Sequence, residues 1–204
     1  MSIGEFLAVF ASIILAIGVG DLSMSLHRLL SAGNRVRWDW LSPAAAMFVL
    51  LNIVAFWWAC YGWYRSAPNL SVVGFLPDIA MFVLLVLSAA AALPDEVPLE
   101  GLDLRQFYFG RARYFYGLQV ALMALVVADL GPRYARGGWL PVLAAQWDNL
   151  AMIGLCLMLI FVRRYWVHAL TLALLLSYSC WSYAHFSIAN HTTDSRAAAT
   201  GQLS

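Results

Sequence analysis

Long apolar stretches separated by short polar segments dominate the chain. A helix needs about 20 apolar residues to cross the hydrocarbon core of a bilayer, and six stretches approach that length: 3–22, 41–64, 72–93, 113–130, 140–162 and 165–186. The pattern predicts an all-α protein, a polytopic membrane bundle of about six transmembrane helices that forms one domain over residues 1–190. Residues 191–204 are rich in Ala, Thr and Ser, and we expect them to form a disordered tail.

Two segments continue the helical pattern outside the expected spans. Leucines 22, 26, 29 and 30 keep helical spacing until Ser31, Ala32 and Gly33 interrupt it, so the first helix is expected to continue past the bilayer. In 102–116, phenylalanines are interleaved with arginines. This segment is expected to be an amphipathic helix in the headgroup region, where its arginines meet lipid phosphates. These arginines are Arg105, Arg111 and Arg113.

The composition makes the bilayer the expected partner. Hydrophobic residues make up 63% of the 204 residues and charged residues 11%, whereas a soluble domain carries about 25% charged residues. The net charge of +1 and the lack of a basic block give no sign of a nucleic-acid partner. Three cysteines without a C-x-x-C spacing indicate neither a disulfide framework nor a metal site. No catalytic or cofactor motif is present, so neither an enzyme nor a cofactor is predicted.

The arginines predict the orientation of the spans. Loops one, three and five carry eight of them, and the opposite side carries four. Since positive residues favour the cytoplasmic side, both termini are expected outside. The eight are Arg28, Arg35, Arg37, Arg105, Arg111, Arg113, Arg163 and Arg164, and the four are Arg65, Arg133, Arg136 and Arg196.

A weak internal echo favours three helices plus three, as in inverted-repeat transporters. The first helix ends in Gly-Asp-Leu at 20–22 and the fourth in Ala-Asp-Leu at 128–130. The residues Trp40, Leu41 and Pro43 are likewise similar to Trp139, Leu140 and Pro141. The spacing differs between the two halves, so chance and duplication both remain open.

Asp148 is the main candidate for function, because it lies inside the apolar stretch 140–162. A carboxylate at this depth costs about 2.5 to 3.5 kcal/mol and usually faces a cavity or a partner. Gln146 and Asn149 flank it, and Asn52 of the second span is expected at a similar depth. A polar pocket between helices is one interpretation. The other is that Asp148 is paired structurally and that Asn52, Gln119 and Asn149 hold the bundle together by interhelical hydrogen bonds.

Two further acids have both a structural and a functional interpretation. Asp78 follows Pro77, and in the first turn of the third helix it would stabilise the helix dipole. Otherwise it would lie on the same side of the membrane as Asp148 and serve as a co-ligand. Asp21, near the inner end of the first helix, shares a helical stripe with Arg28. It either pairs with that arginine or forms an inner gate.

The histidines raise a remote haem possibility. A b-type haem bound by two histidines needs imidazoles that face each other at one depth. His27 and His168 both fall at inner helix ends. Interfacial histidines without a cofactor are the commoner case.

Several segments resemble a group of small bacterial six-helix inner-membrane proteins of uncharacterised function. They are IGVGDLSMSLHRLL at 17–30, Arg-Val-Arg-Trp at 35–38, Phe-Trp-Trp at 56–58, Leu-Asp-Leu-Arg at 102–105 and Tyr-Phe-Tyr-Gly at 114–117. The resemblance covers about the first 120 residues, and it implies a bacterial inner membrane and no particular activity.

Two functions of different classes follow from these observations. The first is a membrane protein that moves or senses a proton, a small cation or a small solute through a polar pocket at Asp148. The second is a non-enzymatic accessory or structural subunit, whose polar residues fix helix packing and whose partner is a membrane complex or a second copy of the chain. A haem or other redox protein is the remote third.

Overall fold

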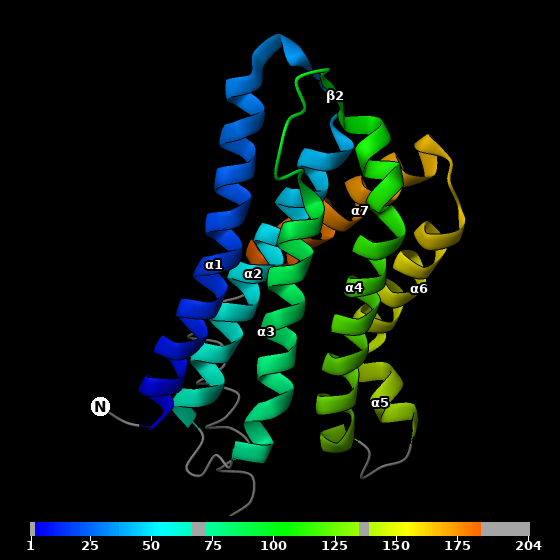
Figure 1. Ribbon diagram of the computed structural model, residues 1–204. Coiled ribbons are helices and arrows are strands. Elements are labelled where there is room, and N and C mark those ends of the chain that lie inside the picture. Colours follow the sequence, from blue (N-terminus) through cyan, green and yellow to red (C-terminus); the bar gives the residue numbers. More distant parts are fainter. Residues whose placement is uncertain (1–2, 67–71, 135–138, 185–204) are drawn as a thin grey trace, which may run out of the picture.

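Four long helices run side by side along the length of the molecule in the computed structural model (Figure 1). They are α1 (Ile3–Ala32), α2 (Leu41–Ser66), α3 (Val72–Ala92) and α4 (Leu104–Tyr134). The structure describes residues 3–66, 72–134 and 139–184. Within these ranges, four segments are long and apolar enough to cross a membrane: Glu5–Arg35, Leu41–Cys60, Gly74–Ala92 and Leu104–Leu130. The expected all-helical architecture is confirmed, and four of the expected spans have the length and composition that a bilayer requires.

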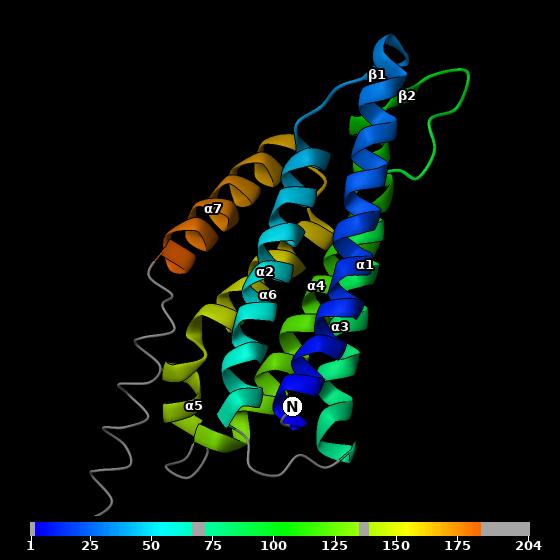
Figure 2. The same ribbon diagram turned by 90° about the vertical axis from the view of Figure 1, so that its left-hand side faces the viewer.

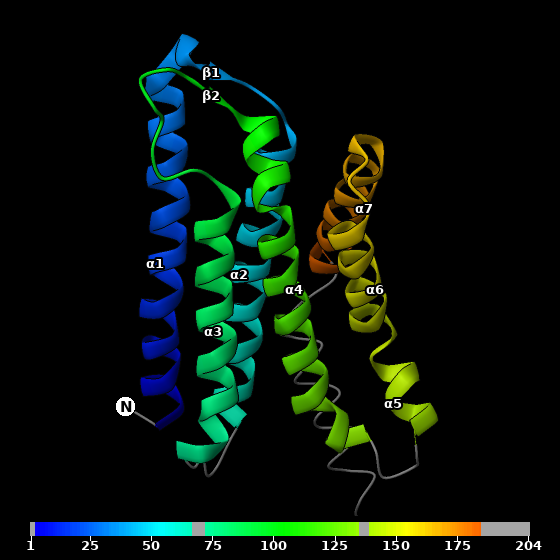
Figure 3. The same ribbon diagram turned by 45° about the vertical axis from the view of Figure 1, so that its right-hand side comes forward.

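The predicted fifth span is not one continuous helix, and a total of six crossings stays a prediction. It is divided into α5 (Trp139–Ala145) and α6 (Trp147–Phe161), which lie on the outer side of α4 (Figure 3). Gln146 separates them with φ −119° and ψ 16°, away from helical values. The amide of Gln146 still bonds the Val142 carbonyl at 3.0 Å, and the Leu150 amide bonds the Gln146 carbonyl at 3.0 Å. The chain therefore bends at Gln146, and hydrogen bonds of the helical type continue across the bend.

The last helix, α7 (Tyr165–Ala184), crosses the bundle obliquely (Figure 2). It follows α6 after a short connection, residues 162–164. Its main packing partner is α2, while α6 packs chiefly against α4. The end of the expected span 165–186 and the expected tail 191–204 lie outside the described residues.

The predicted amphipathic segment 102–116 does not form a helix of its own. Residues 102 and 103 form a short strand, and the rest of the segment is the first part of α4. This helix runs without interruption for 31 residues, or about 46 Å at 1.5 Å per residue. One face of this first part packs into the bundle, because Leu104, Tyr108 and Ala112 are buried at four-residue spacing. Burial of this face keeps the segment parallel to the other long helices of the bundle. In a helix lying flat on the membrane surface, the same face would not pack against other helices.

The connections after α1, α3 and α6 lie at one end of the bundle, as the alternation of spans predicts (Figure 1). At this end α1 continues to Ala32, as expected, and a short 3-10 helix, η1 (Gly33–Arg35), follows it. Two short parallel strands, β1 (Val36–Arg37) and β2 (Leu102–Asp103), then join the first connection to the third. Gly101 has φ +102° and approaches the Arg35 carbonyl so closely that a Cβ would lie 3.1 Å from it.

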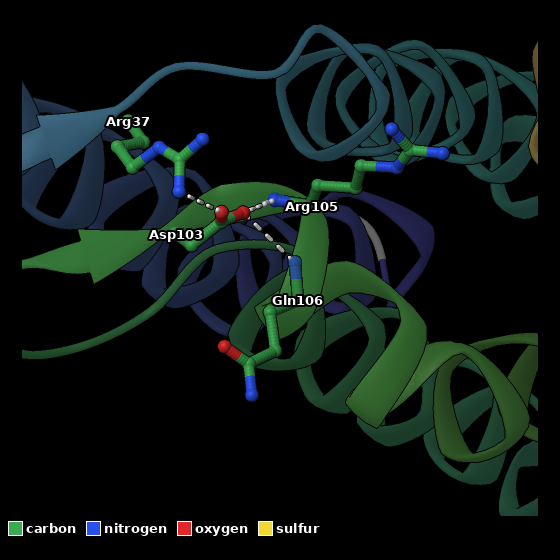
Figure 4. A network of polar contacts seen from close by, with 4 residues as sticks. All are labelled: Arg37, Asp103, Arg105 and Gln106. Carbon is green, nitrogen blue, oxygen red and sulfur yellow. Dashed lines mark hydrogen bonds and ion pairs between the residues drawn. The ribbon is translucent and has the colours of Figure 1, made fainter.

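Asp103 connects this cap to the first turn of α4. Its carboxylate accepts the amides of Arg105 and Gln106 at 2.9 and 3.1 Å and pairs with Arg37 at 3.4 Å. Figure 4 shows the carboxylate between Arg37 and those two amides, while the side chains of Arg105 and Gln106 point away from it. A carboxylate at this position satisfies helix amides that have no partner within the helix.

The core lies between α1, α2, α3 and α4 and continues to α6 and α7. Pairs of helices pack in sequence, α1 on α2 and α3, α3 on α4, α4 on α6 and α2 on α7. The largest fully buried side chains include Tyr116, Phe48, Phe82 and Leu122. Large apolar side chains also cover the outside, as expected for helices whose solvent is lipid, among them Phe6, Ile13, Ile17, Leu170 and Trp181.

Candidate functional site

Asp148 lies in the first turn of α6 and is half-buried. The Tyr178 hydroxyl of α7 donates a hydrogen bond to its Oδ2 atom at 3.4 Å. Asp148 precedes Arg163 by 15 residues, which corresponds to about 22 Å of helix. Since Arg163 stands at the end of the bundle that carries β1 and β2, the carboxylate lies well below that end.

Gln146 and Asn149 surround the bend beside Asp148. Gln146 is buried, and its Oε1 atom accepts a hydrogen bond from Asn149 Nδ2 at 2.7 Å. The two amides predicted to flank Asp148 therefore bond to each other. This bond fixes the side-chain orientations at the bend between α5 and α6.

Asn52 is buried in α2 and is tied to α7 in a similar way. The Tyr183 hydroxyl donates to its Oδ1 atom at 3.2 Å. Its Nδ2 atom is buried and has no hydrogen-bond partner in the described part of the chain. Asn52 and Asp148 are thus each bonded to a tyrosine of α7, five residues apart, and no hydrogen bond between the two is observed among the described side chains.

These tyrosines lie on a side of α7 that also carries buried leucines, and we call the polar side chains of this side the polar edge. Helical spacing places its members within one arc of the helix, and three of them, His168, Thr171 and Ser179, are almost fully buried. The polar edge consists of His168, Thr171, Tyr178, Ser179 and Tyr183. Through hydrogen bonds it contacts α2, α4 and α6.

Gln119 lies near the middle of α4 and is fully buried. Neither its Oε1 nor its Nε2 atom has a hydrogen-bond partner within the residues that the structure describes. The interhelical bond proposed for it from the sequence is therefore not observed. A buried polar atom without a partner costs about 1 to 3 kcal/mol, so this amide favours a polar group beside it.

Asp78 and Asp21 differ from their structural interpretations. Pro77 lies inside α3 and not in its first turn, because α3 already begins at Val72. Asp78 therefore lies beyond the first turn of α3, where a carboxylate would stabilise the helix dipole, and its side chain is buried. Asp21 does not form the expected ion pair with Arg28, whose Nη1 atom donates to the Asp95 carbonyl at 2.8 Å. The Oδ2 atom of Asp21 is buried and has no partner among the described residues.

A buried chain of hydrogen bonds joins α4 to α7, and the sequence did not predict it. The hydroxyls of Tyr108 and Tyr116 are 2.7 Å apart, and the Tyr108 hydroxyl is 2.9 Å from His168 Nδ1. His168 Nε2 is 2.7 Å from the Val162 carbonyl. The available signal was the eight-residue spacing of Tyr108 and Tyr116, which places two hydroxyls on one face of α4.

The contacts of His168 do not favour a haem. Both of its ring nitrogens are in hydrogen bonds, and the rings of Tyr108, Phe109 and Tyr116 surround it. His27, its suggested partner, is exposed on α1 and lies 3.5 Å from the Ser31 hydroxyl. The structure does not bring the two histidines together as a ligand pair, because α1 packs on α2 and α3 while α7 packs on α2.

The three arginines of the predicted lipid interface lie on the outside of α4. The guanidinium carbon of Arg105 is 4.4 Å from the centre of the Tyr165 ring, and that of Arg111 is 5.8 Å from the Phe107 ring centre. Arg113 is exposed. All three side chains are exposed, so the contact with lipid phosphates stays a prediction.

The described residues contain no group of three or more His, Cys, Asp or Glu side chains that could hold a metal ion. Of the three cysteines, Cys60 and Cys156 are buried, whereas Cys180 is exposed. Comparison of the chain with protein-family models, curated proteins and solved structures finds no match.

Proposed function

We propose that the protein moves or senses a proton, a small cation or a small solute through the polar groups around Asp148. The hydrogen bond between Asp148 and Tyr178 carries this proposal, because it sets a half-buried carboxylate of α6 against the polar edge of α7. The same edge holds Asn52 of α2. Polar groups of α2 and α6 are therefore each bonded to a tyrosine of α7, and transporters commonly build their binding sites where polar groups of several helices meet.

Each group has a distinct part in this proposal. Asp148 supplies the charge that attracts a cation or takes up a proton. Gln119 and Asn52 offer buried amide atoms without partners in the described residues, which suits them to a polar solute or water. Asp78, which is buried, is the proposed co-ligand, and Asp21, which is half-buried with its Oδ2 atom fully buried, is the proposed inner gate.

The setting that we propose is a bacterial inner membrane, crossed six times, with both termini outside. Four helices meet the length and hydropathy of a span. The α5–α6 pair and α7 would supply the other two crossings, and a 3+3 repeat remains part of this proposal. The eight arginines at one end of the bundle favour that end as the cytoplasmic side.

Flux measurements test the proposal directly. The protein is reconstituted into proteoliposomes with a trapped pH dye, and a potential and gradients of protons, sodium and potassium are imposed in turn. We expect flux in the wild type that Asp148→Asn abolishes, since asparagine keeps the shape of the side chain and removes its charge. Glu100→Gln is the matched control, because Glu100 is an exposed acid outside the helices. Equal flux in wild type and Asp148→Asn would contradict the proposal.

The alternative is a non-enzymatic accessory or structural subunit of a membrane complex or homo-oligomer. The Tyr108–Tyr116–His168 chain favours it, because every hydroxyl and ring nitrogen there has a partner. Such a network fixes helix packing and needs no ligand. Purification of a defined partner together with wild-type protein that shows no flux would support this function. A Soret band in purified protein would revive the remote haem or redox alternative.

A further inference from the structure

We propose that the groove between α4 and the α6–α7 connection binds the phosphate of an anionic phospholipid. The groove is open, has a volume of about 430 Å³, and is lined by Gln106, Phe109, Gly110 and Arg163. Small-ligand sites have volumes of about 300 to 1,000 Å³. The site lies apart from Asp148 and is independent of the transport proposal.

Arg163 is held in place as the main phosphate-binding side chain. Its Nη2 atom donates to the Phe109 carbonyl of α4 at 2.9 Å, so the side chain crosses from the α6–α7 connection to α4. A guanidinium carries five N–H donors, and this bond takes one. The remaining donors suit a phosphate, which arginine binds in two-pronged fashion.

The floor of the groove is bare helix backbone. Gly110 has no side chain, and a Cβ at this position would meet nothing within 4 Å. A headgroup can therefore approach α4 closely here. Gln106, one turn earlier on the same face, is exposed and supplies an amide for hydrogen bonds to the phosphate or to a hydroxyl of the headgroup.

The local charge favours an anion. Arg163 is the charged residue of the lining, and none of the lining residues is acidic. Arg105 lies one turn before Phe109 and is held against Tyr165 at the start of α7, which adds a second cation beside the groove. The nearest acid in sequence, Asp103, is already paired with Arg37 and with the first turn of α4.

Apolar side chains beside the groove make a lipid the better occupant than a free anion. Phe161 and Trp166 flank Arg163 in the sequence and are 77% and 81% exposed. Aromatic residues of this kind anchor proteins at the membrane interface. The headgroup would occupy the groove while its acyl chains lie along these exposed side chains. Basic pockets between membrane helices are known to bind anionic headgroups.

Native mass spectrometry of the full chain in uncharged detergent tests this proposal. The protein is titrated with dioctanoyl phosphatidylglycerol, dioctanoyl phosphatidylcholine and inorganic phosphate. We expect saturable binding of the first and much weaker binding of the other two. Arg163→Gln should weaken phosphatidylglycerol binding about tenfold, as the loss of a charge-assisted hydrogen bond does. Gly110→Leu should weaken it similarly by filling the groove.

Two matched variants control for general effects. Arg164→Gln removes the neighbouring charge, which does not line the groove, and Gly117→Leu adds the same bulk elsewhere on α4, where a Cβ also meets nothing within 4 Å. Both should bind phosphatidylglycerol like the wild type. Equal losses in the Arg163 and Arg164 variants, unchanged binding in Gly110→Leu, or equally tight binding of phosphatidylcholine or free phosphate would overturn the proposal.

Discussion

The Tyr108 hydroxyl is the centre of the hydrogen-bond chain between α4 and α7, so its removal has a calculable cost. It has two partners, the Tyr116 hydroxyl at 2.7 Å and His168 Nδ1 at 2.9 Å. Tyr108→Phe removes both bonds and leaves the ring in place. Tyr116→Phe removes the first of the two bonds. The two variants therefore differ by the bond that joins the helices.

The magnitude follows from the number of bonds lost. A hydrogen bond contributes about 0.6 kcal/mol on average between membrane helices and about 0.5 to 1.5 kcal/mol in soluble proteins. Tyr108→Phe should therefore lower the free energy of unfolding by about 1 to 3 kcal/mol. Tyr116→Phe should lower it by about half as much. Tyr114→Phe is the control, because this exposed tyrosine of α4 takes no part in the Tyr108–Tyr116–His168 hydrogen bonds. Its substitution should change the free energy of unfolding by less than about 0.5 kcal/mol.

Reversible unfolding in mixed micelles with increasing dodecyl sulfate, followed by tryptophan fluorescence, measures these differences. The double variant Tyr108→Phe/Tyr116→Phe should be no less stable than Tyr108→Phe by more than a few tenths of a kcal/mol, since their shared bond is already lost. A cost for Tyr108→Phe no greater than that for Tyr114→Phe would refute the argument. Additive costs in the double variant would do the same.

Two further predictions concern the cap that joins the first and third connections. Gly101→Ala should destabilise the protein by more than about 1 kcal/mol, because Gly101 has φ +102° and a Cβ would lie 3.1 Å from the Arg35 carbonyl. Gly20→Ala, in the interior of α1 with open space around it, should instead be neutral or stabilise the protein by up to about 1 kcal/mol. Thermal unfolding of the two variants measures this difference, and equal shifts of their unfolding temperatures would contradict the prediction. Asp103→Ala should lower the free energy of unfolding by about 0.5 to 2 kcal/mol because it removes the cap of α4, whereas Glu100→Ala should lower it by less than about 0.5 kcal/mol. The same unfolding assay measures both variants. A larger loss of stability in Glu100→Ala than in Asp103→Ala would exclude this role of Asp103.

The helices could be predicted from the sequence because their apolar length is a local property of the chain. Length and hydropathy located four spans, although the fourth begins at Leu104 and not at residue 113, and the extension of α1 to Ala32 followed from leucine spacing and Gly33. The bend at Gln146 could not be predicted in this way, since no proline or glycine stands there. At the bend the buried Gln146 side chain is bonded to Asn149, a contact that periodicity does not show.

The polar interior was predictable by residue type but not by partner. Asp148, Asn52 and Gln119 stood out because polar groups are costly in an apolar span. The partners of Asp148 and Asn52 come from α7, and the sequence of α7 does not show that this helix packs on α2. The same holds for the segment at 102–116, where alternation of phenylalanine and arginine indicated a surface helix although buried tyrosines hold it in the bundle.

Flux and stability measured on the same preparation of Asp148→Asn test the central claim most directly. The proposed role requires that flux through wild-type proteoliposomes is lost in this variant while the free energy of unfolding stays within about 0.5 kcal/mol of the wild type. A variant that keeps the wild-type flux, or a loss of flux matched by a loss of folded protein, would contradict a functional role for Asp148.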